Sequence, residues 1–154
     1  MNENLTVILD CSGSFDENGK IEILRSLRLS TARIAKNFGA RSTFFTWREE
    51  INPQTSPKDI VARGKVDVSA LVNFINTCPE SAKILLLSDG IWDLNACAKI
   101  KSALAARHAA LVFVAVGADA NRSANYNIST FGGVWSPADL PSAVQMLLFG
   151  DGAS

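Results

Sequence analysis

Leu5-Thr6-Val7-Ile8-Leu9-Asp10-Cys11-Ser12-Gly13-Ser14 is the stretch of this chain that decides its fold. The first five residues form a short apolar run with β-branched side chains, which is typical of a buried strand. A carboxylate and two hydroxyls follow at alternate positions, Asp10, Ser12 and Ser14. Ligands of an open α/β sheet bind in the crevice beyond the carboxyl ends of its strands. We therefore expect an oxygen-lined site there, and oxygen ligands suit a hard divalent cation such as Mg²⁺.

The rest of the chain alternates between helical and strand patterns. Helical spacing of apolar residues predicts helices at 21–38, 69–77, 94–107 and a last one after Asp139, which is the expected N-cap. Strand patterns occupy 42–47, 83–88 and 110–116, with short ones near 50–51 and 133–135, and 54–65 is expected to be a polar surface connection. This order predicts a single α/β domain over 1–154. It is doubly wound and Rossmann-like, with a mostly parallel sheet, one short antiparallel edge strand and helices on both faces.

The composition argues against several classes of protein. Fifteen Lys and Arg residues balance 15 Asp and Glu, so the net charge predicts no nucleic-acid and no membrane partner. The cysteines Cys11, Cys78 and Cys97 lack metal-finger spacing and indicate a reducing compartment, where thiols pack as small apolar groups. The longest apolar run, 109–116, is shorter than the ~20 residues that span a bilayer. We therefore expect a cytoplasmic protein.

A second acidic element, Leu87-Ser88-Asp89-Gly90, ends the predicted strand at 83–88. Right-handed crossovers place that strand beside the first one, so Asp89 is expected to face Asp10 across the crevice. Two converging carboxylates repel each other unless a cation or protons compensate their charge. The pair therefore strengthens the metal interpretation.

These two motifs resemble those of a von Willebrand factor type A (VWA) domain, and the resemblance covers nearly the whole chain. Phe45-Thr46 at the end of the second strand and Gly132-Gly133 before the closing helix also match. The resemblance implies a protein-binding module whose bound Mg²⁺, Mn²⁺ or Ca²⁺ captures an acidic side chain of a partner. Similar stand-alone cytoplasmic domains occur in bacterial systems alongside AAA+ ATPases, or alongside kinases and phosphatases, so the resemblance implies such a partner.

The implied site is a metal-ion-dependent adhesion site (MIDAS). In that site the two serines of the motif ligate the ion directly, which implies this role for Ser12 and Ser14. The two aspartates act largely through bound waters, which implies that role for Asp10 and Asp89.

One position departs from the family. A threonine normally lies in the loop before the second helix, and Val66 stands in the best-matching place. Valine has no ligand atom, so Asp67 is predicted to supply the missing oxygen, with Ser69 as the alternative if the loop is shifted. Lys65 would instead place a positive charge near the site and weaken it.

Aromatic residues follow both motifs. Trp92 comes directly after the Asp-Gly element and Phe15 directly after the serines. Aromatic side chains on the rim of a site suit protein recognition, so we predict that both contact the partner. A core role is the open alternative for Trp92, as it is for Trp47 and Trp135.

Enzyme motifs are absent from the sequence. A phosphoaspartyl phosphatase motif needs a second Asp where Ser12 stands, and neither the G-x-S-x-G nucleophile elbow nor the phosphate-binding loop occurs. We therefore predict a non-catalytic, metal-dependent protein-binding module. A metal-free structural adaptor is the first alternative. A metal-assisted hydrolase, with Asp16 or Glu17 as general base, is the second.

Overall fold

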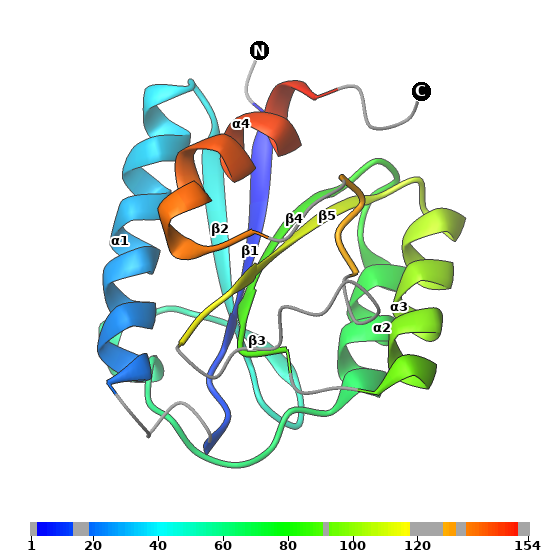
Figure 1. The fold of residues 1–154 in the computed structure, drawn as a ribbon, viewed down its shortest axis with the longest axis horizontal. Coiled ribbons are helices and arrows are strands. Elements are labelled where there is room, and N and C mark those ends of the chain that lie inside the picture. The colour runs from blue at the N-terminus through cyan, green and yellow to red at the C-terminus, as the bar shows by residue number, and fades with distance from the viewer. Residues whose placement is uncertain (1–2, 14–18, 91–92, 118–127, 132–134, 151–154) are drawn as a thin grey trace.

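The structure is a computed structural model that describes residues 3–13, 19–90, 93–117, 128–131 and 135–150 (Figure 1). Within these residues five strands form one sheet in the order β3-β2-β1-β4-β5. Their bounds are β1 Asn4–Asp10, β2 Arg41–Trp47, β3 Ile51–Pro53, β4 Lys83–Ser88 and β5 Ala110–Ala115. Neighbouring strands pair in parallel except for β3, which is antiparallel to β2 at the edge. The predicted sheet is confirmed.

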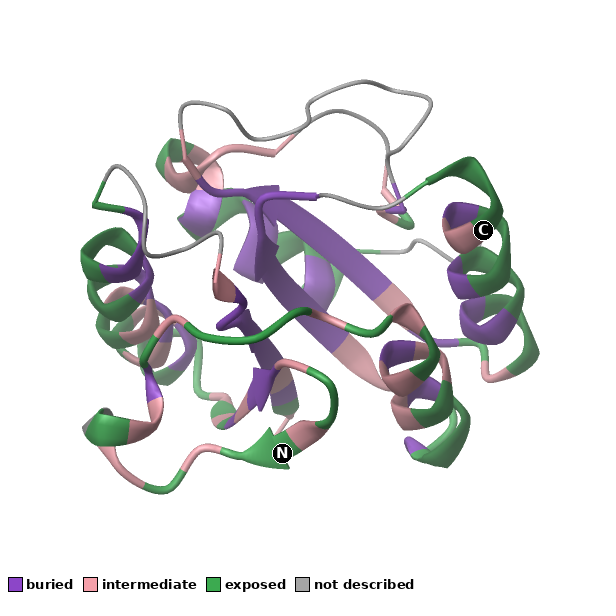
Figure 2. Cartoon of the chain, turned by 90° about the horizontal axis from the view of Figure 1, so that it is seen from below, coloured by how far each residue is buried: buried purple, intermediate pink, exposed green. Residues whose placement is uncertain are grey.

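Helices cover both faces of the sheet, as predicted (Figure 1). Their bounds are α1 Lys20–Asn37, α2 Val68–Thr77, α3 Leu94–Ala106 and α4 Leu140–Phe149, with 3-10 turns η2 Pro57–Asp59 and η4 Pro137–Asp139. Successive side chains of a strand point to opposite faces, and β1 follows this rule. Val7 and Leu9 pack in one core with α1 and α4. Ile8 packs in a second core with α2 and α3. Buried residues follow the sheet and the inner helix faces, and exposed residues lie outside (Figure 2).

Local sequence signals account for the helix ends. Asp139 stands at the N-cap position of α4, as expected, but its carboxylate accepts from the N–H and the hydroxyl of Ser136 and not from the helix. At its carboxyl end α1 leaves the cover of the core at Phe38. Gly39, with φ 78°, ends the helix there, and the Phe38 side chain is 36% exposed. Its ring lies 5.6 Å, centroid to centroid, from that of Phe149 in α4.

The connection at 54–65 is less peripheral than the polar sequence predicted. Ile60 is buried in the core beneath α1, and its carbonyl accepts two hydrogen bonds from the Arg25 guanidinium. The strand expected near 133–135 lies largely outside the described residues, although Trp135 forms a parallel bridge with Val114. No described helix is both long and apolar enough to cross a membrane.

Candidate metal site

The two acidic motifs meet at the carboxyl edge of the sheet. Strands β1 and β4 are parallel neighbours, with Leu9 beside Leu87, so the residues that follow them emerge together. Asp10 ends β1, Ser88 ends β4, and Asp89 comes next. Asp10 and Asp89 therefore lie at the same edge of the sheet, as the strand order predicts.

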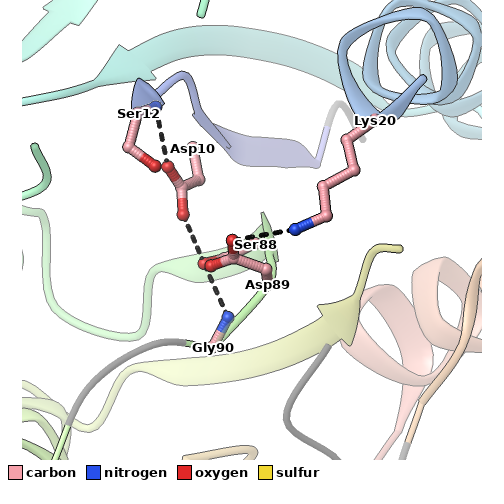
Figure 3. A network of polar contacts seen from close by, with 6 residues as sticks. All are labelled: Asp10, Ser12, Lys20, Ser88, Asp89 and Gly90. Atoms are coloured by element: carbon pink, nitrogen blue, oxygen red, sulfur yellow. Dashed lines mark hydrogen bonds and ion pairs between the residues drawn. The ribbon is translucent and has the colours of Figure 1, made fainter. Parts of the chain in front are cut away.

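A hydrogen-bond network fixes the Asp10 carboxylate (Figure 3). Its Oδ1 accepts from the backbone N–H of Ser12 at 2.9 Å, and its Oδ2 accepts from the Ser88 hydroxyl at 2.6 Å. The Ser88 oxygen in turn accepts from the Gly90 N–H at 3.1 Å. The side chain of Ser12 is a further hydrogen-bond partner of this carboxylate. Asp10, Ser12 and Ser88 are all buried.

Burial dominates the electrostatics of Asp10. It raises the pKa of this carboxyl to about 6, against the opposing effect of the hydrogen bonds from Ser88 and Ser12. The negative charge of Asp89 raises the pKa further. A buried carboxyl with a raised pKa is short of compensating positive charge, and a nearby cation would lower that pKa again.

Lys20, which neither sequence motif contains, completes this network (Figure 3). Lys20 is the first residue of α1, and its Nζ lies 3.4 Å from Asp89 Oδ2. Only 1% of the Lys20 side chain is exposed, and 3% of the Asp89 side chain. The signal was present in the sequence, because Lys20 stands one helical turn before Leu24 on the buried stripe of α1.

The loop before α2 lies against the serine motif. Gly13 N–H donates to the Gly64 carbonyl at 2.7 Å, and Arg63 N–H donates to the Cys11 carbonyl at 3.0 Å. Cys11 is a free cysteine wholly buried in the core, and burial raises its pKa to about 12. An un-ionised, inaccessible thiol fits the expected packing role.

Asp67 has a different position from Asp10. It is the N-cap of α2, and its carboxylate accepts from Ser69 N–H at 2.8 Å. Its carbonyl accepts from the indole N–H of Trp47 at 3.0 Å. Among the described residues no contact joins the Asp67 carboxylate to Asp10, so its predicted ligand role stays a prediction. Trp47 is wholly buried, and Val66 packs against the core of α2 and α3.

Three of the predicted site residues, Ser14, Phe15 and Trp92, lie outside the described residues. Within the described part of the chain, no three His, Cys, Asp or Glu side chains cluster in a way that could hold a metal ion. Among the residues that the structure describes, the donors at this edge are the Asp10 and Asp89 carboxylates and hydroxyls, all of them oxygens. With the Lys20 ammonium, these described groups carry one net negative charge. In kind and in charge they fit a hard divalent cation.

Comparisons with known proteins address the fold. No protein-family model matches the chain, and no curated protein matches it by sequence. The manganese-loaded TRAP protein of Plasmodium vivax matches with a TM-score of 0.65 at 12% identity, over 96% of this chain and 73% of that chain. BatB of Bacteroides thetaiotaomicron matches with a TM-score of 0.60 at 12% identity, over 95% and 98%.

A mutant of the PilB minor pilin from Streptococcus sanguinis matches with a TM-score of 0.60 at 9% identity, over 96% of this chain and 63% of that one. At such low identities the similarity establishes the fold and nothing finer. The chain therefore has a VWA-like fold of the Rossmann type.

Proposed function

We propose that this chain is a non-catalytic protein-binding module of the VWA type, with a MIDAS at the carboxyl edge of the sheet. The observation that supports the proposal is the buried oxygen network of Asp10, Ser12 and Asp89 where β1 and β4 end. Mg²⁺ or Mn²⁺, with Ca²⁺ as a further option, would provide a position that binds a carboxylate oxygen from another protein. Asp10, Ser12 and Asp89 would hold the ion, together with Ser14 from the loop outside the described residues.

The charges of the site favour an acidic partner. Counted over the described residues, two carboxylates and the Lys20 ammonium leave one negative charge, which a dication would convert into one positive charge. A single Asp or Glu side chain then makes the assembly neutral. Because uncompensated charge in a buried site is costly, this balance favours the capture of one carboxylate.

The structural similarities support a protein partner at the level of the fold. The matching TRAP protein is manganese-loaded, and PilB is a minor pilin. For this chain we propose a partner that presents Asp or Glu. A component of an AAA+ ATPase, kinase or phosphatase system is the first class to test.

Titration calorimetry tests the ion. Wild-type protein should bind one Mg²⁺ or Mn²⁺, and Asp10→Asn should abolish the binding. Asp93→Asn is the matched control, because Asp93 is an exposed N-cap of α3 and asparagine caps a helix equally well. Binding that survives in Asp10→Asn would contradict the assignment of the ion to this network.

An NMR titration tests the carboxylate. Acetate added to the Mg²⁺-loaded protein should shift the amides of Ser12 and Asp89, and it should shift neither in EDTA. Ser12→Ala should remove the response. Phosphatase, nuclease and peptidase assays should stay at background, and metal-dependent turnover that is lost in Asp10→Asn would favour a hydrolase instead.

A metal-free structural adaptor is the second candidate, and a specific observation favours it. Lys20 already supplies Asp89 with a buried counter-charge at 3.4 Å. The adaptor would still bind a partner protein. It would release no heat in the titrations with Mg²⁺ and Mn²⁺, and its NMR spectrum would not respond to acetate.

A further inference from the structure

We propose that Lys20 is a built-in counterion of the candidate metal site and that it sets how tightly the site holds a divalent cation. The effect on ion affinity rests on the proposed function, whereas the counterion role rests on the contacts alone. Lys20 reaches from the start of α1 across the end of the sheet to Asp89, where Nζ lies 3.4 Å from Oδ2 (Figure 3). The two residues are 69 positions apart in the sequence.

The protein is shaped around the aliphatic stem of this lysine. Gly117 follows β5 and has a φ of 100°. Residues other than glycine rarely adopt this backbone conformation. A Cβ at this position would lie 2.8 Å from Lys20 Cε and 3.2 Å from Cδ and Cγ. The backbone of residue 117 thus leaves room for the lysine stem, and the ammonium is directed into the crevice.

Both groups of this ion pair are buried. Removing one partner of a buried ion pair takes away charge compensation from the other in a medium of low polarity, which is destabilising. Asp89 also faces the negative charge of Asp10. The ammonium therefore offsets the repulsion that the two carboxylates would otherwise create, and the edge of the sheet can fold without a metal ion.

The same ammonium opposes a dication. Any ion held by Asp10 and Asp89 comes close to Nζ, and like charges at short range repel each other. Lys20 therefore weakens the binding of a metal ion on its own. A carboxylate from a partner supplies the negative charge that the loaded site lacks, so ion and partner should bind cooperatively.

The test is a Mn²⁺ titration of Lys20→Met, which keeps an unbranched apolar stem and loses the charge. Lys101→Met on the exposed face of α3 is the matched control. Lys20→Met should bind Mn²⁺ at least about tenfold more tightly than wild type, the order expected when a unit charge is removed near a dication. Acetate should tighten Mn²⁺ binding more in wild type than in Lys20→Met. Equal Mn²⁺ affinities in wild type and Lys20→Met would overturn the tuning role.

A double-mutant cycle in EDTA tests the counterion role without metal. Lys20→Met and Asp89→Asn should each lower the melting temperature, and the double variant should lose less than the sum of the two. Additive losses would overturn the counterion role. If wild type binds no Mn²⁺, the proposed function fails. The double-mutant cycle still tests the counterion role of Lys20 in that case. If Lys20→Met does not fold, a folded double variant supports the pairing and an unfolded one refutes it.

Discussion

The hydroxyl of Ser88 donates a 2.6 Å hydrogen bond to Asp10 Oδ2, and it joins the ends of two parallel strands that lie 78 residues apart in the sequence. Both side chains are fully buried. The same Ser88 oxygen accepts from Gly90 N–H, so it also fixes the turn that carries Asp89. One hydroxyl thereby sets the relative position of the two carboxylates that would hold an ion.

Ser88→Ala should destabilise the protein. The change leaves Asp10 Oδ2 and the Gly90 N–H without this partner, and a buried polar group left unsatisfied costs roughly 1–3 kcal/mol. Urea unfolding should show that loss, whereas Ser102→Ala on the exposed surface of α3 should be close to neutral. Equal effects of the two changes would show that the Ser88 bond adds nothing to stability.

The contribution of Asp10 to stability should fall as pH rises from about 4 to about 7 in metal-free buffer. Burial raises the pKa of Asp10 from 3.8 to about 6, so between these values the folded state binds more protons than the unfolded state. The stabilisation that protonated Asp10 provides is complete below the unfolded pKa and is lost as pH rises through the folded pKa. A shift of this size corresponds to about 2–3 kcal/mol.

Unfolding curves of wild type and Asp10→Asn across this range measure the effect. The free energy of unfolding of wild type should decline relative to that of Asp10→Asn as pH rises. Saturating Mg²⁺ should reduce the decline, because a bound cation favours the ionised carboxylate. A relative free energy that does not change with pH would refute the raised pKa.

Asp67 offers a test that separates a helix cap from a metal ligand. Asp67→Ala should cost about 1 kcal/mol, because it removes the side-chain acceptor of the Ser69 N–H. Asp67→Asn should stay within a few tenths of a kcal/mol of wild type, since asparagine caps a helix as well. If Asp67 is the ligand that the sequence predicts, both variants should also weaken Mn²⁺ binding. Unchanged Mn²⁺ affinity in both would leave it as a cap alone.

Gly117→Ala should be more destabilising than Gly39→Ala. Both glycines have positive φ, at 100° and 78°, so both changes impose backbone strain of about 1–2 kcal/mol. At 117 the added methyl group also meets the Lys20 stem, whereas nothing lies within 4 Å of it at 39. Chemical unfolding of both variants measures the difference, which should shrink in a Lys20→Ala background. A difference that persists there would mean that Lys20 is not the source of the crowding.

The order of strands and helices follows from the sequence because side-chain periodicity is local. The β-branched run before Asp10 and the apolar run before Asp89 predicted two buried parallel strands, and β1 and β4 are adjacent. The right-handed connection rule then predicted that the two carboxylates would meet. Phe38 is an exception, because an apolar pattern predicts which face of a helix is buried but not how far the neighbouring elements extend along that face. At the end of α1 the Phe38 ring packs against the Phe149 ring and remains 36% exposed.

The sequence predicted the mostly parallel sheet and the placement of Asp10, Ser12 and Asp89 at one edge, because side-chain periodicity is local and nearly all parallel crossovers have the same hand. The pairing of a lysine with Asp89 in the same crevice does not follow from local patterns. In the sequence Lys20 lies one turn before Leu24 on the stripe of α1, but this spacing does not show which charge a buried lysine would meet. Its burial requires the open backbone of Gly117 and the charge of Asp89, both distant in the chain. A charged side chain enters a core only where its counter-charge is already positioned, and only the folded chain provides that position.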